Sequence, residues 1–413
     1  MMELQKLRRQ FPALMQQVNG QSPIFLDGPG GSQVPQSVLS AMSAYLGYYN
    51  SNLGGAFFSS DKTVSLMGNA RQAVADLLNA PSKEQIVFGA NMTSLTFSFS
   101  RALSRDWQVG DEVIVTNADH FSNVSSWRQA AEDKGAQVHA VKIDDADCTL
   151  DLAHYKSLLN HKTKLVAVTY ASNTTGSIND IKQIVELAHQ VGALVYVDAV
   201  HYAPHELIDV QALNCDFLAC SAYKFFGPHV GIVYGKREHL EGFTPYKVEP
   251  AKDVIPGRWE TGTQSFEGLA GVIAAIDYVA SLSELPESTP RRERLAKAFV
   301  NSKEHEMALS AHFLKRLADF PQIRLFGIED ESRLAERTPT FALTFEGLAP
   351  REVSEFLGKQ HMCVWDGNFY AQGLCEQLGV MDKGGVVRIG CMHYNTIEEL
   401  EKLFSAFEEL LKI

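Results

Sequence analysis

Two polar side chains follow consecutive apolar segments of the chain, and their chemistry is complementary. Asp198 lies at the end of the segment ALVYVDA, and Lys224, 26 residues later, follows the segment FLACSA. A lysine can form a Schiff base with an aldehyde and exchange it for a substrate amine. A carboxylate can keep a pyridine nitrogen protonated, which makes the ring withdraw electrons from an attached carbon. The pair therefore points to pyridoxal 5'-phosphate as the cofactor.

Other polar residues stand where the same cofactor needs partners. Met92 and Thr93 open a predicted helix, whose N-terminal N–H groups favour a phosphate, and Ser221 supplies a hydroxyl. His120 is expected to stack on the cofactor ring. Taken singly these signals are weak, because an aspartate at a strand end is often a cap and a lysine is often a surface residue.

Competing cofactor motifs are missing from the sequence. There is no GxGxxG after the first predicted strand and no GxxxxGK[ST] anywhere, so dinucleotide and P-loop sites are excluded. His201 and His205 have the spacing of a metal-binding pair, but Pro204 between them interrupts the helix that this spacing requires. We expect no metal site.

Seven short apolar segments separated by helical stretches must position these residues. This alternation predicts an α/β fold with a mostly parallel, seven-stranded sheet, in which polar residues after the strands meet at one edge. The last strand follows Gly227-Pro228 closely, so it could enter antiparallel. We expect a large domain over residues 21–282 and a small α+β domain from residues 1–20 and 283–413. The predicted strands are Ile86–Gly89, Glu112–Thr116, Gln137–Ile143, Lys164–Tyr170, Ala193–Ala199, Phe217–Ala222 and Gly231–Gly235.

Composition limits the function further. The 413 residues have a formal net charge of -12, so no basic field is available and a nucleic-acid partner is not expected. No segment reaches the length of a membrane span, and no export signal is visible. The six cysteines are too sparse for a disulfide scaffold and form no CxxC pair. We expect a cytoplasmic protein with no membrane partner.

Over nearly its whole length the sequence resembles the class V aminotransferase family of pyridoxal phosphate enzymes, and within it the cysteine desulfurase and selenocysteine lyase type. The resemblance implies the aspartate aminotransferase-like fold, fold type I. The stretches that carry it, in this order, are LDGPGGS, IVFGANMTS, GDEVIV with ADHFSNVSSW, KTKLVAVTYASNTTGSI, VYVDAVHYAPHELIDVQALNCDFLACSAYKFFGPHVGIVYGK, WETGTQSFEGLAG and VVRIGCMHYNTIEEL.

The resemblance also implies a role for each matching residue. Lys224 matches the Schiff-base lysine, and Arg388 matches the arginine that binds the α-carboxylate of an amino-acid substrate. Thr263 matches a phosphate contact that comes from the neighbouring subunit, which implies a homodimer with a shared active site. The implied cofactor contacts are Met92, Thr93 and Ser221 at the phosphate, His120 on the ring face, Asp198 at the pyridine nitrogen, Asn173 on the hydroxyl side, His201 where glutamine is usual beside the ring hydroxyl, and Tyr223 where histidine is usual.

The sequence departs from this family pattern at a loop that carries the chemistry of desulfurases. There the family reads roughly Arg-x-Gly-His-His-Cys-Ala, and its cysteine becomes a persulfide. This chain has Trp365 at the arginine position and Tyr370 at the cysteine position, and a phenol cannot carry a sulfane sulfur. Cys375 is five residues further along, which is too far for a loop that is not rearranged. Cys363 lies seven residues before Tyr370 in a predicted strand and is expected to be a core residue.

We therefore expect an enzyme that binds an amino acid through Arg388 and withdraws electrons at its Cα, without forming a persulfide. Transamination, racemisation and elimination stay open, because each begins with proton abstraction by Lys224. Tyr370 is expected to act as a general acid or as a lid. One alternative is a cysteine desulfurase or selenocysteine lyase that uses a displaced thiol, Cys375 or Cys363. Another is a non-catalytic protein that retains the cofactor.

Overall fold

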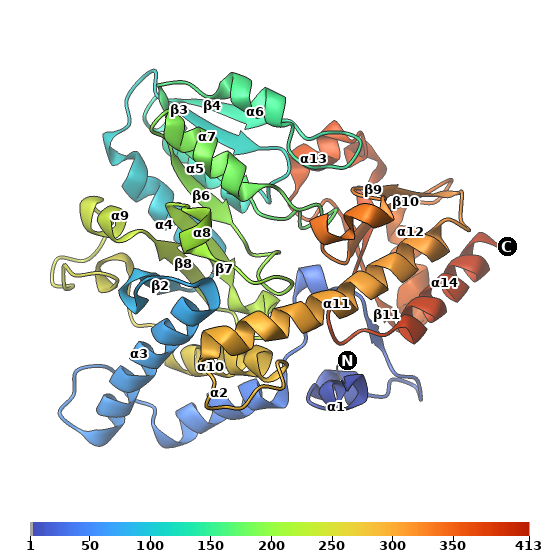
Figure 1. Cartoon of the computed structure of the whole chain (residues 1–413), viewed down its shortest axis with the longest axis horizontal. Helices are drawn as coiled ribbons and strands as arrows, with labels where there is room; N and C mark the ends of the chain where they lie inside the picture. The colour runs from blue at the N-terminus through green and yellow to red at the C-terminus, as the bar shows by residue number, and fades with distance from the viewer. Residues whose placement is uncertain (1–2, 413) are drawn as a thin grey trace.

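The centre of the molecule is a seven-stranded sheet, described in a computed structural model that covers residues 3–412 (Figure 1). Each strand overlaps a segment that its β-branched and apolar residues predict. The α/β fold and the number of strands in this sheet are thus confirmed. In spatial order the strands are β2 (Ile86–Gly89), β8 (Gly231–Gly235), β7 (Phe217–Ser221), β6 (Leu194–Asp198), β5 (Thr163–Thr169), β3 (Glu112–Thr116) and β4 (Gln137–Val141).

One strand runs against the others. β3, β4, β5, β6 and β7 pair in parallel, whereas β8 is antiparallel to both of its neighbours, β2 and β7. The connection from β7 to β8 spans only residues 222–230, which is too short for a parallel crossover of about a dozen residues. The antiparallel entry of the last strand is therefore confirmed.

Helices cover both faces of this sheet, which is why its strands are apolar on both sides. Val113 and Val115 of β3 point to α4 (Met92–Leu103) and α5 (Ser122–Glu132), while Ile114 points to the opposite face. That face is covered by α3 (Phe58–Leu78), α7 (Ile181–Gln190) and α10 (Phe266–Ser281). The remaining helices of this part are α2 (Gln36–Tyr48), α6 (Leu152–Leu158), α8 (Val210–Leu213) and α9 (Arg237–Gly242).

A smaller α+β part follows, as predicted. Its four-stranded antiparallel sheet has the order β12, β13, β10, β9, and its core includes Phe313 stacked on Phe341 with ring centroids 3.8 Å apart. The long helix α11 leads from the large part to this one (Figure 1). Its elements are α11 (Arg291–Leu317), β9 (Ile323–Phe326), β10 (Thr340–Phe345), α12 (Pro350–Lys359), β12 (Trp365–Gly367), α13 (Gln372–Gln377), β13 (Val386–Gly390) and α14 (Ile397–Leu411).

The N-terminal segment contacts both parts. It contains α1 (Leu4–Arg8) and β1 (Ile24–Phe25), and β1 pairs in parallel with β11 (Met362–Cys363). The Phe11 ring packs edge-on against Tyr278 of α10 and against Tyr394, which precedes α14. The predicted domain boundaries, 1–20 with 283–413 and 21–282, stay a prediction. Among the described helices, none is long and apolar enough to cross a membrane.

Candidate active site

A pocket opens at the carboxyl ends of the parallel strands, where the polar residues were predicted to meet. It has about 570 Å³ of space, including its open mouth. Most of the predicted site residues line it together, although they come from segments far apart in the sequence. The lining includes Met92, Thr93, His120, Asn173, Asp198, His201, Ser221, Tyr223 and Lys224.

Lys224 lies at the floor of this pocket, at the end of a single helical turn (Ala222–Lys224) that directly follows β7. Its side chain is buried, and its Nζ donates a hydrogen bond to the carbonyl of Pro29. Burial and the nearby Arg388 lower the pKa of the Lys224 ammonium to about 7, against the attraction of Asp198 and Asp27. A substantial share of the amine is thus unprotonated at neutral pH, as a nucleophile requires.

Asp198 is the last residue of β6, and its carboxylate is almost completely buried. The N–H of Val200 donates to Asp198 Oδ1 at 2.9 Å, which fixes the side chain at the strand end. Burial raises the pKa of this carboxyl to about 6, although Lys224 lowers it in part. A buried carboxylate of this kind favours a cationic partner, such as a protonated ring nitrogen.

The N-terminus of α4 forms one end of the pocket. Asn91 caps this helix by accepting a hydrogen bond from the N–H of Ser94 at 2.8 Å. The N–H of Met92 donates to Ser221 Oγ at 3.3 Å, so the two predicted phosphate partners lie side by side. Gly231 permits this approach, because a Cβ there would lie 2.3 Å from the backbone of Asn91. The helix dipole and free N–H groups can hold a phosphate.

His120 lies on another wall of the pocket in a defined protonation state. Its Nδ1 accepts a hydrogen bond from the N–H of Ser122 at 3.1 Å, so the ring proton must be on Nε2. Burial, with the charges of Lys224 and Arg388, lowers the pKa of His120 to about 4. The ring is therefore neutral at neutral pH and can face an aromatic cofactor without charge repulsion.

Arg388 on β13 belongs to the small part and lies beside the pocket, in contact with Asn173 of its lining. Its Nη1 donates to the carbonyl of Asn173 at 2.9 Å, and its guanidinium carbon lies 3.9 Å from the centre of the Phe369 ring. Burial lowers the pKa of Arg388 to about 9, so it stays charged at neutral pH. Within residues 3–412 its buried Nε has no hydrogen-bond partner. An uncompensated donor of this kind fits a carboxylate that binds through the edge of the guanidinium.

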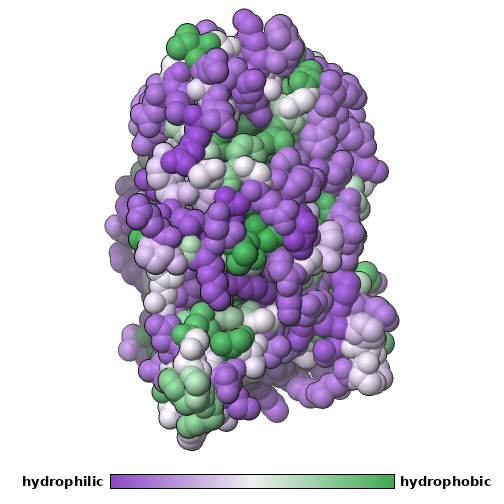
Figure 2. All heavy atoms as spheres, turned by 90° about the vertical axis from the view of Figure 1, so that its left-hand side faces the viewer, coloured by the Kyte–Doolittle hydropathy of each residue, from purple (hydrophilic) through white to green (hydrophobic). Residues whose placement is uncertain are grey.

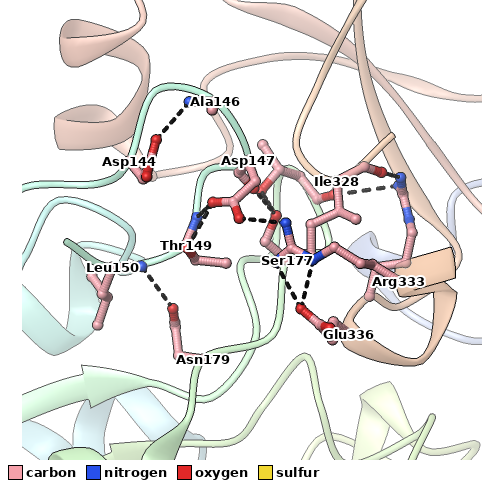
Figure 3. A network of polar contacts seen from close by, with 12 residues as sticks. Asp144, Ala146, Asp147, Thr149, Leu150, Ser177, Asn179, Ile328, Arg333 and Glu336 are labelled. Atoms are coloured by element: carbon pink, nitrogen blue, oxygen red, sulfur yellow. Dashed lines mark hydrogen bonds and ion pairs between the residues drawn. The ribbon is translucent and has the colours of Figure 1, made fainter. Parts of the chain in front are cut away.

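Ser177 and Asn179, at the end of the loop that begins near Asn173, bind the segment 147–150 (Figure 3). Ser177 Oγ donates to the carbonyl of Asp147 at 2.6 Å, and Asn179 Oδ1 accepts from the N–H of Leu150 at 3.0 Å. Asp147 in turn forms an ion pair with Arg333 of the small part at 2.9 Å. These contacts fix Asn173, whose Nδ2 donates to the carbonyl of Phe369 at 3.0 Å.

Tyr370 and Trp365 lie at the open side of the site. Phe369 and Tyr370 both have left-handed backbone conformations, with φ of 53° and 59°, and the carbonyl of Tyr370 accepts from the N–H of Phe121 at 2.7 Å. The Tyr370 side chain is 71% exposed, and its ring centre is 5.1 Å from that of His120. Trp365 is 52% exposed and lies opposite Arg388 in the strand register.

Thr263 lies apart from the other predicted residues. It is exposed and lines a neighbouring cavity together with Ser94 and His229. The first turn of α4 lies between the two cavities, since Thr93 lines one and Ser94 the other. In a single chain the structure does not bring Thr263 to the pocket that holds Lys224, and its predicted role from a neighbouring subunit stays a prediction.

Two residues of this site were missed in the sequence. Asp27 is close enough to Arg388 and Lys224 to interact with both, and burial raises its pKa to about 6. Its Oδ1 is buried and, among the described residues, has no hydrogen-bond partner. Phe369 covers the face of Arg388. Asp27 follows the strand β1, so a search of every strand end would have found it, whereas nothing in the sequence signals the contact of Phe369.

The residues present fit pyridoxal phosphate. A buried lysine amine, a buried carboxylate at a strand end and a helix N-terminus line a single pocket, and an arginine with a free donor edge lies beside it. Within the described chain, no group of three or more His, Cys, Asp or Glu side chains is arranged to hold a metal ion. Lys224 would hold the aldehyde carbon, Asp198 the ring nitrogen and the first turn of α4 the phosphate.

Comparisons with known proteins agree with this arrangement. The sequence profile of the family "Aminotransferase class-V" matches residues 24–403. An aminotransferase-like protein, FGM3, of Gibberella zeae is 34% identical over 99% of this chain and 98% of its own. A probable cysteine desulfurase of Halalkalibacterium halodurans is 31% identical over 99% of this chain and 98% of its own. The apo structure of the cysteine desulfurase from Thermococcus onnurineus superimposes with a TM-score of 0.88 at 26% identity, covering 100% of this chain and 98% of that one.

Proposed function

The chain belongs to the class V aminotransferase family and is a pyridoxal phosphate-dependent enzyme, and we propose that it abstracts the α-proton of an amino acid without forming a persulfide. The observation that carries this proposal is the complete lysine, aspartate and arginine set beside a loop whose cysteine is replaced by Tyr370. Transamination, racemisation and elimination share this first step, so all three fit the site.

The proposed roles follow from the contacts. When bound, pyridoxal phosphate supplies an electron-withdrawing ring to the Cα of the amino acid. Arg388 binds the substrate carboxylate through the edge that Asn173 leaves free, and this fixes which bond of Cα faces Lys224. The amine of Lys224, with its lowered pKa, takes the α-proton and can return it. Tyr370, exposed and beside His120, covers the substrate side.

The cysteines support a route without persulfide. Cys375 is fully buried in α13, and burial raises the pKa of its thiol to about 11. Burial likewise raises the pKa of the Cys363 thiol to about 11. A thiolate is the reactive form, so both thiols are poor nucleophiles at neutral pH. Six free cysteines are also in keeping with a reducing compartment, and we propose the cytoplasm.

We also propose that two copies of the chain share the active site. Apolar side chains gather at the lower end of the face in Figure 2, over the segment that joins α2 to α3. Their extent exceeds what isolated exposed residues would produce, which favours a covered surface. Mass measurement in solution is expected to give a dimer, and Phe58→Asp is expected to weaken it. The exposed residues of this segment and its ends are Leu46, Tyr48, Tyr49, Leu53, Phe57 and Phe58.

Deuterium exchange tests the proposed first step. The protein loaded with pyridoxal phosphate is incubated in deuterium oxide with a panel of amino acids, and loss of the Cα proton is followed by NMR. At least one amino acid is expected to exchange, and Lys224→Ala is expected to abolish the exchange while the phosphate site stays intact. If no amino acid of a broad panel exchanges, the proposed function is wrong.

The second candidate is a cysteine desulfurase with a displaced thiol, which the names of several relatives favour. It requires Cys375 or Cys363 to reach the substrate sulfur. Release of sulfide from L-cysteine that Cys375→Ala or Cys363→Ala abolishes would establish this route. Because Cys375 is buried, Cys375→Ser serves as the control for packing.

A further inference from the structure

His201 connects the cofactor pocket with the small part of the molecule. Its ring is buried and lines the pocket. Its Nε2 lies 3.1 Å from Thr338 Oγ1 and 3.1 Å from Thr340 Oγ1. Within residues 3–412, Nδ1 has no hydrogen-bond partner. A neutral imidazole has one donor and one acceptor nitrogen, so the position of its single proton decides what the pocket contacts.

The hydroxyl groups of the two threonines settle this position. Thr338 Oγ1 can donate its proton to the carbonyl of Gly176, at 3.4 Å. Thr340 is fully buried, and in the described part of the chain His201 Nε2 is the only partner of its hydroxyl. A buried hydroxyl proton without an acceptor is costly. Thr340 must therefore donate to Nε2, which places the imidazole proton on Nδ1.

His201 carries only one ring proton at neutral pH. Burial lowers its pKa well below the ordinary value, and the nearby charges of Arg388 and Lys224 and the neighbouring His205 act in the same direction. His205 packs edge-on against His201, with ring centres 5.4 Å apart, and its Nδ1 lies 2.9 Å from Glu306 Oε2. Burial and the neighbouring groups thus both disfavour a second proton on the His201 ring.

The position of Thr340 is fixed by its surroundings. It is the first residue of β10, and its carbonyl accepts a hydrogen bond from Arg337 Nη2 at 2.6 Å. Gly176 has a φ of +78°, and a Cβ there would lie 2.8 Å from both Thr338 Oγ1 and the carbonyl oxygen of Thr340. Only glycine lets the Asn173 loop approach this closely, and the loop thereby packs directly against both threonines.

We propose that Thr340 is a positioning residue that holds His201 in the tautomer with its proton on Nδ1, so that the small part of the molecule sets a hydrogen-bond donor in the cofactor pocket. This inference rests on the proposed cofactor contacts, in which His201 stands beside the ring hydroxyl. An N–H donor there favours the ionised ring oxygen. It serves the purpose of the glutamine amide that the family resemblance expects at this position.

The pH dependence of the bound cofactor's visible absorbance tests the proposal without any substrate. Thr340→Val keeps the shape of the side chain but removes the donor. We expect it to raise the pH midpoint of the absorbance change by about 0.5 unit or more, because the ring oxygen loses a donor. Thr340→Ser, which keeps the hydroxyl, is expected to restore the midpoint. Thr338→Val, the matched control, is expected to shift it by less than about 0.2 unit.

A double-mutant cycle separates this role from a purely structural one. A glutamine amide needs no tautomer, so Thr340→Val is expected to have no further effect on the midpoint in the His201→Gln background. Equal shifts in both backgrounds, or equal shifts for Thr338→Val and Thr340→Val, would overturn the proposal.

The wild-type protein gives a direct answer if the variants do not bind the cofactor. Nitrogen-15 NMR of labelled histidine, with His201→Gln to assign the signal, reports which ring nitrogen carries the proton. A proton on Nδ1 supports the inference, and a proton on Nε2 contradicts it. Neither measurement needs turnover, so a failure of the proposed α-proton chemistry would be seen separately.

Discussion

Replacing Arg388 by lysine changes how the site holds a carboxylate while keeping the positive charge. In the structure one N–H of Nη1 donates to the carbonyl of Asn173, whereas Nε has no partner among the described residues, so the edge formed by Nε and Nη2 is the one we expect a carboxylate to use. Gly30 lies next to this edge, since a Cβ there would lie 3.6 Å from Nη2. A lysine ammonium offers one nitrogen in place of this two-nitrogen edge. Arg388→Lys therefore removes one of two charge-assisted hydrogen bonds to the substrate.

The size of the effect follows from that loss. A hydrogen bond to a charged group contributes about 1.5–3 kcal/mol, which corresponds to roughly 10- to 100-fold weaker binding of an amino acid. The visible absorbance of the bound cofactor, titrated with the amino acid, measures the affinity. The matched control is the amine with the same side chain and no carboxylate, whose affinity is expected to be unchanged by the substitution.

Two results would refute this reasoning. If the amino acid binds Arg388→Lys within about threefold of the wild-type affinity, Arg388 does not hold the carboxylate. If the amine is weakened as much as the amino acid, the substitution has damaged the cofactor pocket as a whole.

Three further predictions concern individual residues. Burial raises the pKa of Asp198 to about 6, so the folded protein holds a proton on this carboxyl more tightly than the unfolded chain does. The stability that this provides is fully present below the unfolded pKa and is lost as the pH rises through 6. Without the cofactor, Asp198→Asn should therefore be more stable than wild type by about 3 kcal/mol at pH 8 but not at pH 4, as measured by urea unfolding. The variant should bind pyridoxal phosphate weakly. The same stability difference between variant and wild type at both pH values would contradict this prediction. Gly176→Ala should lower the unfolding free energy by more than about 2 kcal/mol, because its Cβ would lie 2.8 Å from backbone and side-chain atoms. The control Gly192→Ala has a similar positive φ and nothing within 4 Å of its Cβ, so it should lower the unfolding free energy by only about 1 kcal/mol. Tyr370→Ala should slow turnover more than Tyr370→Phe does, because the ring beside His120 covers the site; equal losses in steady-state rates would make the hydroxyl the important group.

Much of the fold could be predicted because its signals are local. The strands of the large sheet are apolar on both sides and separated by helices, and this pattern alone indicates a doubly covered parallel sheet. The sequence left the reversal of β8 open as a possibility, and the structure shows it, because the short connection that contains Gly227-Pro228 cannot cross over. The ends of the strands likewise predict Asp198, Ser221 and Lys224 as neighbours, and all three line the pocket.

The rest of the site depends on contacts between distant segments. Thr340 belongs to the small part and His201 to the large part, so their contact arises only from how the two parts pack. Phe369 and Arg388 both belong to the small part, but their contact depends on the path of the loop after β12. The protonation state of the Lys224 amine likewise depends on burial by residues that are far away in the sequence. No spacing rule encodes such contacts, so these residues could not be singled out beforehand.

The central claim is tested most directly by adding L-cysteine to the protein loaded with pyridoxal phosphate and analysing the products. We predict that the absorbance of the cofactor changes as the amino acid binds, while alanine does not accumulate together with sulfide, because Tyr370 stands where a persulfide-forming cysteine would be needed. Equal amounts of alanine and sulfide, produced over many turnovers, would contradict this account.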